Sequence, residues 1–270
     1  MAEPDETAIA DIARRISASP KYRPLLQRTI MRIATDCVVR HGIKEGEKYA
    51  RSLLHQSWGA YNPYRPRYDK LAEQLVTRFA EGRDRKTAVL PLLESHSSTA
   101  ERVASLETFY ERIFAVTGIP SSILDLACGM NPLTIPWMGL PDSTRFAGRD
   151  IDEEQNAFLN KALAITGFAP EQAQVLGGDI LCDEPEYADI VLMLKILPVL
   201  EHQKKGSSLE IIRKQPARHI VVSYPSGSLS GGKKKMGDFH ADNFMNLVGN
   251  ERWTISALTF EREVVFVIGK

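Results

Sequence analysis

Three acidic side chains fall at or just after the ends of predicted strands, a placement that could bind an adenosyl group. Asp125 lies near the end of ILDLA, Asp150 ends FAGRD, and Asp179 follows VLGG. In open α/β sheets, ligands bind outside the carboxyl ends of the strands. Asp150 is suited to accept hydrogen bonds from ribose hydroxyls, and Asp179, beside the apolar Ile180, is suited to bind the exocyclic amine of an adenine. Each acid alone could be a solvated loop residue, but together they predict a pocket for S-adenosylmethionine.

The turn after the first of these strands is built from small residues, so its backbone could approach a ligand. It reads Ala127, Cys128 and Gly129. The turn has no complete GxGxxG or P-loop pattern, which argues against a dinucleotide or P-loop site. Taken alone, the same residues would also suit a plain connection between a strand and a turn.

A single lysine interrupts an apolar stretch further along the chain. Residues 189–200 read DIVLMLKILPVL, with Lys195 in the middle. A buried ammonium is costly unless it has a charged partner or reaches water. Two interpretations remain open: a lysine at a strand end that extends its stem to solvent, or a lysine at the mouth of an active site.

The elements that must position these residues begin with helices. Apolar residues recur at helical spacing in the first ninety or so residues, where no clear strand is visible. A later helix is predicted from Ser98 to Gly118, with Ser98 and Glu101 as a capping box and Gly118 as its end. The earlier helices are predicted over residues 8–18, 25–41, 45–58, 69–80 and 88–93.

Beyond residue 120, strands and helices alternate. Near-continuous apolar strands between helices predict a parallel sheet covered on both faces, and the last two strands predict an antiparallel hairpin. This is the α/β, Rossmann-like fold of class I S-adenosylmethionine-dependent methyltransferases. We place it at residues 95–270, after an N-terminal helical domain at residues 1–94. Strands are predicted over residues 121–127, 143–150, 173–178, 188–197, 218–225, 253–260 and 263–270.

Composition and charge narrow the function classes. The 270 residues include 43% hydrophobic residues and three widely spaced cysteines, so we expect a soluble, cytoplasmic protein without disulfides or bound metal. The net charge is zero, yet residues 12–92 hold 17 Lys and Arg against 7 Asp and Glu. This basic part could meet an anionic surface, or its arginines could simply be solvated.

Six segments form a more specific set: LLHQSWGAY, HSSTAERVASLETFY, ILDLACGMNPL, DID, LMLKILPVL and SYPSGSLSG. Together they resemble the aminoglycoside-resistance 16S rRNA (guanine-N7) methyltransferases of the Arm and Rmt type, from about residue 53 to the C-terminus. The resemblance implies methyl transfer from S-adenosylmethionine to N7 of one guanine in the ribosomal decoding site. It also implies that the helical domain helps to dock the enzyme on the 30S subunit.

The resemblance further implies which residues hold the cofactor. Arg102 would bind the methionine carboxylate, a task that suits a guanidinium, although by itself Arg102 would be taken for an exposed helix charge. Ala127 replaces the glycine that many methyltransferases have in this turn. Tyr61 or a neighbouring aromatic would cover the pocket, although such side chains are more often core between domains. The implied cofactor set is Tyr61, His96, Ser97, Ser98, Arg102, Ala127, Gly129, Asp150, Asp179, Ile180, Leu194 and Gln203.

Chemistry at N7 predicts what the residues at the mouth of the site do. Guanine N7 has an in-plane lone pair and loses no proton, so no general base is needed and placement of the base carries the catalysis. We therefore predict that Lys195 holds a phosphate or the O6 edge of the target nucleotide. Side chains read the major groove of RNA poorly, so the target base is expected to flip out.

Two further residues are predicted to contact the flipped base. Glu201 would accept hydrogen bonds from guanine N1–H and N2–H2, and Met236 would pack against the ring. Residues 226–238 form a low-complexity basic stretch, which we expect to be a flexible loop. Its Lys233, Lys234 and Lys235 would contact RNA phosphates, although such lysines are also typical of a solvated surface loop.

The predicted protein is thus a monomeric 16S rRNA methyltransferase that confers aminoglycoside resistance and binds neither DNA nor a membrane. Two alternatives remain open from the residues alone. One is a small-molecule methyltransferase with a helical lid, which would act without ribosomes. The other is a cofactor-binding rRNA assembly factor, which would bind the subunit without transferring a methyl group.

Overall fold

Two long helices open the chain and form a unit of their own. The computed structural model describes residues 5–59, 65–226 and 233–270, without the side chains of residues 233–239. Helix α1 (Glu6–Ser17) is capped at its N-terminus by Asp5, whose side chain accepts a hydrogen bond from the Ala8 amide. Helix α2 (Gln27–Leu54) continues into a π-helical turn, η1 (His55–Gly59). The two helices predicted here are joined across Gly42, whose φ of 76° makes a kink.

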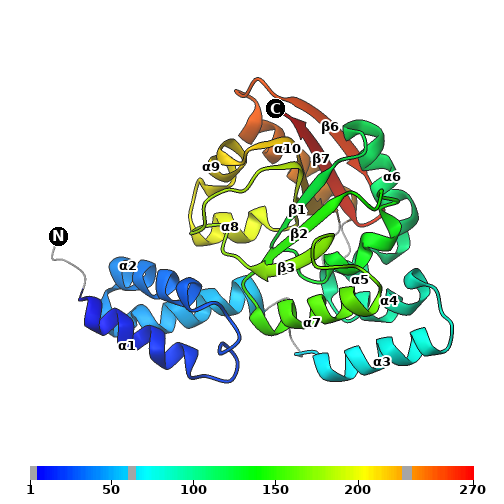
Figure 1. The fold of residues 1–270 in the computed structure, drawn as a ribbon. Helices are drawn as coiled ribbons and strands as arrows, with labels where there is room; N and C mark the ends of the chain where they lie inside the picture. The colour runs from blue at the N-terminus through cyan, green and yellow to red at the C-terminus, as the bar shows by residue number, and fades with distance from the viewer. Residues whose placement is uncertain (1–4, 60–64, 227–232) are drawn as a thin grey trace.

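Figure 1 shows helices α1 and α2 beside one another at the N-terminal end of the chain. This α1–α2 unit has its own apolar core and is joined to the rest of the protein through backbone contacts. The segment before α2 lies against the segment that follows strand β2. The Leu26 amide donates to the Ile151 carbonyl at 2.9 Å, and the Glu153 amide donates to the Pro24 carbonyl at 2.9 Å. The helical unit is therefore bound to the chain immediately after Asp150.

Helices α3 (Tyr68–Ala80) and α4 (Arg85–Leu93) pack elsewhere, against the main core of the molecule. Leu75 and Leu92 share that core with Phe158 of helix α7 (Glu153–Ile165). The predicted helices at residues 69–80 and 88–93 are confirmed. The domain boundary near residue 94 stays a prediction, although this packing groups α3 and α4 with the sheet.

The predicted helix from Ser98 to Gly118 is wrong in its first turns. The chain forms a short helix α5 (Ser97–Arg102), a 3₁₀ turn η2 (Val103–Ser105) and helix α6 (Leu106–Thr117). His96, not Ser98, occupies the N-cap position, and there is no side-chain cap. Glu101 does not close a capping box because its carboxylate pairs with Lys195. Gly118, with φ of 74°, ends α6 as predicted.

A seven-stranded sheet forms the centre of the fold, in the order β3-β2-β1-β4-β5-β7-β6 (Figure 1). The first five strands are parallel, and β7 runs antiparallel to both β5 and β6. The predicted terminal hairpin is confirmed, with its second strand inserted next to β5. The strands are β1 (Ser122–Leu126), β2 (Arg145–Asp150), β3 (Ala173–Gly177), β4 (Ala188–Leu194), β5 (Ala217–Pro225), β6 (Thr254–Thr259) and β7 (Glu263–Gly269).

The connections place helices on both faces of this sheet. Helix α7 and the 3₁₀ segment η3 (Asn131–Trp137) belong to the core that includes α3 and α6. Helices α8 (Leu197–Gln203), α9 (Ser207–Lys214) and α10 (Lys233–Val248) contribute to the core on the other face. Helix α10 corrects the loop predicted for residues 226–238, since its first turns begin at Lys233. Within the described part of the chain, no helix has the length and apolarity that crossing a bilayer requires.

Candidate active site

A pocket lies where the carboxyl ends of the parallel strands meet helix α2 and the π-helical turn η1. Its wall includes most of the residues predicted to bind the cofactor. The structure brings together His96, Ser98, Ala127, Gly129, Asp150, Asp179, Ile180, Leu194, Lys195 and Gln203. The helical unit adds four residues that were not predicted from the sequence: Thr29, Arg32, Ile33 and Ser57. It also adds Trp58, one of the aromatic residues near Tyr61 that the sequence offered as a cover for the pocket.

The turn between β1 and η3 brings bare backbone to this pocket. Ala127 and Gly129 have φ values of 53° and 50°, in the left-handed region that glycine adopts most easily. Glycine would adopt this backbone at Ala127 with less strain than alanine does. A Cβ atom on Gly129 would lie 3.2 Å from Cε1 of His96, so a side chain at this position would press on the pocket wall.

Asp150 is fixed by the backbone at the end of β2. Its Oδ2 accepts a hydrogen bond from the Gly129 amide at 2.9 Å, and its Oδ1 accepts one from the Asp152 amide at 3.2 Å. Burial raises the pKa of Asp150, while these amides act in the opposite direction. A carboxylate has about four acceptor sites, so Asp150 can still accept from a ribose hydroxyl beside the backbone amides that hold it.

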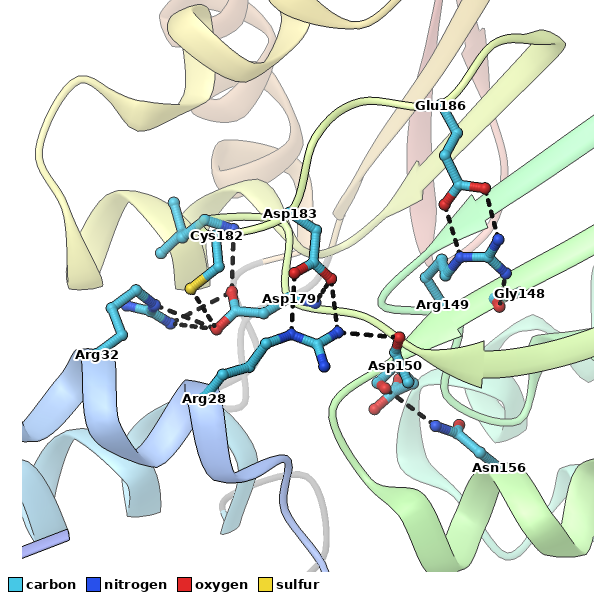
Figure 2. Close-up of polar contacts among 12 residues, drawn as sticks. Arg28, Arg32, Gly148, Arg149, Asp150, Asn156, Asp179, Cys182, Asp183 and Glu186 are labelled. Carbon is cyan, nitrogen blue, oxygen red and sulfur yellow. Dashed lines mark hydrogen bonds and ion pairs between the residues drawn. The ribbon is translucent and has the colours of Figure 1, made fainter.

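Asp179 is held from both sides at the end of β3 (Figure 2). Its Oδ2 accepts hydrogen bonds from Nε and Nη2 of Arg32 at 3.1 and 3.0 Å. Its Oδ1 accepts one from the Leu181 amide at 3.0 Å. Oδ1 also accepts a longer hydrogen bond from Nη2 of Arg32 at 3.4 Å, and Oδ2 accepts one from Sγ of Cys182 at 3.5 Å. Both oxygens are therefore engaged beside the apolar Ile180, and the bond from Arg32 to Oδ1 is the weaker contact.

Two buried polar atoms on the pocket wall have no hydrogen-bond partner in the described part of the protein. They are Nδ1 of His96 and Oγ1 of Thr29. Burial lowers the pKa of His96 to about 4, with smaller contributions from nearby Arg102 and Lys195, so its imidazole is neutral near pH 7. Unpaired buried polar atoms are rare in native proteins. Their presence beside Asp150 and an apolar wall fits a bound molecule with both polar and apolar parts, such as S-adenosylmethionine.

Arg102 is not among the residues that line this pocket. Its Nε and Nη2 donate to the two carboxylate oxygens of Glu263 at 3.0 and 2.7 Å, and its Nη1 donates to Oδ1 of Asn131 at 2.9 Å. The side chain is 1% exposed and its charge is paired inside the protein. The sequence could not show this because Glu263 is 161 residues away. Binding of the methionine carboxylate by Arg102 stays a prediction.

Lys195 follows the last residue of β4 with a φ of 61°, a strained value for a residue with a side chain. Its Nζ donates to Oε2 of Glu101 at 2.6 Å and to the Ser98 carbonyl at 3.4 Å, and it lies 3.9 Å from Oε2 of Glu263. The Lys195 side chain is buried, while Glu101 is 40% exposed. The ammonium is therefore paired at the edge of the pocket instead of reaching freely to water.

Several other predicted residues lie away from the pocket wall or outside the described residues. Glu201 accepts hydrogen bonds from the amides of Gly206 and Ser208 and so ties α8 to the start of α9. Ser97 begins α5 but does not line the pocket. Contacts of Glu201 and Ser97 with the predicted ligands stay predictions. Outside the described residues lie Tyr61 and the side chains of Lys233, Lys234, Lys235 and Met236.

The sequence held weak signals for some of the residues that were missed. Glu263 begins the apolar strand EVVFVIG. A charged residue next to an apolar run was the signal that singled out Lys195, and the same signal was present at Glu263. Arg28 and Arg32 are one helical turn apart, which predicts a shared face but not what that face meets. Thr29 had no signal, because a threonine in a helix is common.

The strand order, the antiparallel β7 and a pocket at the carboxyl ends of β1 to β4 define a class I methyltransferase. The family model of the ribosomal RNA methyltransferases (FmrO) matches residues 18–267, and the chain belongs to this family. The match covers more of the N-terminal part than the sequence segments had indicated.

Relatives and solved structures of similar length agree with this assignment. The chain is 33% identical over 270 residues to a 16S rRNA (guanine(1405)-N(7))-methyltransferase of Micromonospora echinospora, covering 98% of each protein. It is 28% identical to an enzyme of the same name from Proteus mirabilis, covering 98% of this chain and 99% of that one. The crystal structure of the 16S rRNA methyltransferase RmtF with S-adenosyl-L-homocysteine superposes with a TM-score of 0.81 at 28% identity, covering 100% and 99% of the two chains. The 16S rRNA methylase RmtB gives a TM-score of 0.77 at 28% identity, with coverage of 97% and 98%.

Proposed function

We propose that this protein is a 16S rRNA (guanine(1405)-N(7))-methyltransferase that uses S-adenosylmethionine and protects ribosomes from aminoglycosides. The observation that carries the proposal is a match to relatives of that name over nearly the whole chain. The pocket supports it, because three features suited to an adenosyl group meet at one edge of the sheet: carboxylates, a turn of small residues and apolar side chains. We further propose that the enzyme acts as a monomer in the cytoplasm and that its substrate is the 30S subunit.

S-adenosylmethionine, when bound, would supply an electrophilic methyl group at the pocket mouth. Asp150 would hold the ribose, Asp179 and Ile180 the adenine, and the neutral His96 would contribute a polar contact without adding positive charge. The left-handed turn at Ala127 and Gly129 lets the backbone lie close to the donor. We propose that Arg102, Ser97, Ser98, Leu194 and Gln203 complete this cofactor site, with Tyr61 as its cover.

Methylation at N7 needs alignment more than proton transfer. N7 presents its lone pair directly and no proton leaves, so no residue has to act as a base. The strained backbone of Lys195 and its pair with Glu101 fix the ammonium at the pocket edge. We propose that Lys195 contacts a phosphate or the O6 edge of the flipped guanine, and that Glu201 and Met236 hold the base. Lys233, Lys234 and Lys235 would contact phosphates of the same RNA.

A methyl-transfer assay separates this function from its alternatives. Purified protein is incubated with methyl-labelled S-adenosylmethionine and with 30S particles, naked 16S rRNA or small metabolites in parallel. We expect label in the RNA of 30S particles, and reductive aniline cleavage of that RNA should map the modified base to guanine 1405. Expression in a susceptible strain should raise the inhibitory concentration of aminoglycosides, with Asp150→Ala as the inactive control. Label in metabolites would indicate a small-molecule enzyme, and tight 30S binding without label would indicate an assembly factor.

A further inference from the structure

Helix α2 of the N-terminal unit carries one side chain that reaches the two polar groups at the adenine end of the pocket. Arg32 donates through Nε and Nη2 to Oδ2 of Asp179, and through Nη2 to Oε1 of Gln203 at 3.0 Å. Asp179 and Gln203 are 147 and 171 residues away from Arg32. One guanidinium therefore joins the loop after β3, the end of α8 and the helical unit (Figure 2 shows the Asp179 pair).

This bridge fixes which way the side-chain amide of Gln203 points. A glutamine amide offers an acceptor at one end and two donors at the other. Arg32 has only donors, so the carbonyl end of Gln203 must face it and the NH2 end is left for another group. The same nitrogen of Arg32 lies 3.0 Å from both acceptors, so Asp179 and Gln203 stand side by side. The pocket edge then offers an acceptor at Asp179 next to a donor at Gln203.

An adenine has the complementary pattern. Its exocyclic amine is a donor and the neighbouring ring nitrogen is an acceptor. A hypoxanthine has the opposite pattern, with a carbonyl oxygen in place of the amine and a proton on the ring nitrogen. Asp179 would repel that oxygen, and Gln203 could accept from the ring N–H only after its amide turned over. Arg32 opposes that turn.

The environment of Arg32 distinguishes it from a surface ion pair. The side chains of Arg32 and Asp179 are 16% and 4% exposed, and both residues line the pocket. Arg28, one turn earlier, makes a similar pair with Asp183 (Figure 2). There the two side chains are 46% and 38% exposed, and neither residue lines this pocket. Arg28 is therefore a matched control that has the same chemistry and the same helix.

We propose that Arg32 is a positioning residue for the cofactor: it orients Asp179 and Gln203 so that the pocket selects adenine over a base with the opposite hydrogen-bonding pattern. Because Arg32 lies on helix α2, binding of the adenine then depends on the N-terminal unit. This inference rests on the proposed use of S-adenosylmethionine. The bond from Nη2 of Arg32 to Oδ1 of Asp179 is long, at 3.4 Å, so an adenine amine can take its place while the bonds of Arg32 to Oδ2 remain.

Calorimetry with two ligands tests the proposal. The ligands are S-adenosylhomocysteine and S-inosylhomocysteine, which differ only in the amine and its neighbouring ring position. The wild-type protein should prefer the adenosyl ligand strongly, because a site built to hydrogen-bond a group rejects the analogue that lacks it. Arg32→Met should weaken binding of S-adenosylhomocysteine about tenfold, as expected for loss of charge-assisted bonds, and should reduce the preference for it. Arg28→Met should leave both affinities unchanged.

Arg32→Lys keeps a charge beside Asp179 but cannot bridge to Gln203 as a planar fork does. It should bind S-adenosylhomocysteine more tightly than Arg32→Met and still show a reduced preference over the inosyl ligand. The preference is a ratio of two affinities of one sample, so partial unfolding does not change it. Equal or tighter binding of S-adenosylhomocysteine by Arg32→Met, or an unchanged ratio in both variants, would overturn the proposal. Absence of binding to the wild-type protein would instead overturn the proposed function.

Discussion

The pair formed by Arg102 and Glu263 should be a principal determinant of stability, and Glu263→Gln tests this. Both side chains are almost fully buried and meet through two hydrogen bonds. Burial by itself would raise the pKa of Glu263, but Arg102, with help from Lys195 and Ser223, outweighs it and lowers that pKa. The carboxylate is therefore ionised at neutral pH and compensates a guanidinium that has no access to water.

The magnitude follows from what the substitution leaves behind. Glutamine keeps the shape but removes the charge, so Arg102 becomes an uncompensated buried cation. Breaking a buried ion pair in this way costs about 3–5 kcal/mol. For a chain of this size, each kcal/mol lowers the melting temperature by about 2–4 °C, so a loss of about 10 °C is expected. Glu263 also has a depressed pKa, so its contribution should be present near pH 7 and disappear as the pH falls through that pKa.

Urea unfolding followed by far-UV circular dichroism gives the free energy of unfolding for each variant. Glu107→Gln is the control, because Glu107 pairs with Lys86 on the surface and should lose less than about 1 kcal/mol. The double variant Arg102→Met, Glu263→Met removes both charges and should recover part of the loss, since apolar replacements of buried pairs are often nearly neutral. A loss below about 1 kcal/mol for Glu263→Gln, or a double variant less stable than the single one, would refute this reasoning.

Four further substitutions provide tests, three of them at residues that line the pocket and one at Asp125 in strand β1. Asp150→Ala should weaken binding of S-adenosylhomocysteine. Lys195→Ala should keep that affinity but lose methyl transfer to 30S particles. Methyl transfer at the wild-type rate by Lys195→Ala would exclude a role for its ammonium in the reaction. Gly129→Ala places a Cβ atom 3.2 Å from His96 at a φ of 50°, so calorimetry should show weaker cofactor binding, with a cost of about 1–2 kcal/mol in stability; unchanged affinity would mean that the turn does not contact the ligand. Burial raises the pKa of Asp125 to about 7, so this group lowers stability as the pH rises from about 4 to about 7. Asp125→Asn should remove that component of the pH dependence, measured as the free energy of unfolding at several pH values between about 4 and about 7. If that free energy changes with pH in the variant as it does in the wild-type protein, the raised pKa of Asp125 is contradicted.

Local pattern was enough to predict most of the elements. The strand end at Asp150, the helix end at Gly118 and the final hairpin follow from residues that are neighbours in the chain. Helix α10 was missed because its first turns read as a polar, glycine-containing stretch. Its apolar residues are buried only when the helix packs against β5 and β7, where Phe244 stacks on Phe266.

The sequence by itself determined the fold class, the strand-end acids and, through its motifs, the family. Only the tertiary structure decided the charge partners: Glu101 for Lys195, Glu263 for Arg102 and Asp179 for Arg32. The physical reason is range. Hydrophobic periodicity and turn chemistry act over a few residues and leave a readable pattern, whereas an ion pair between residues 94 to 161 positions apart exists only once the chain has folded. A charge on a helix has the same sequence context whether it meets water or a buried carboxylate.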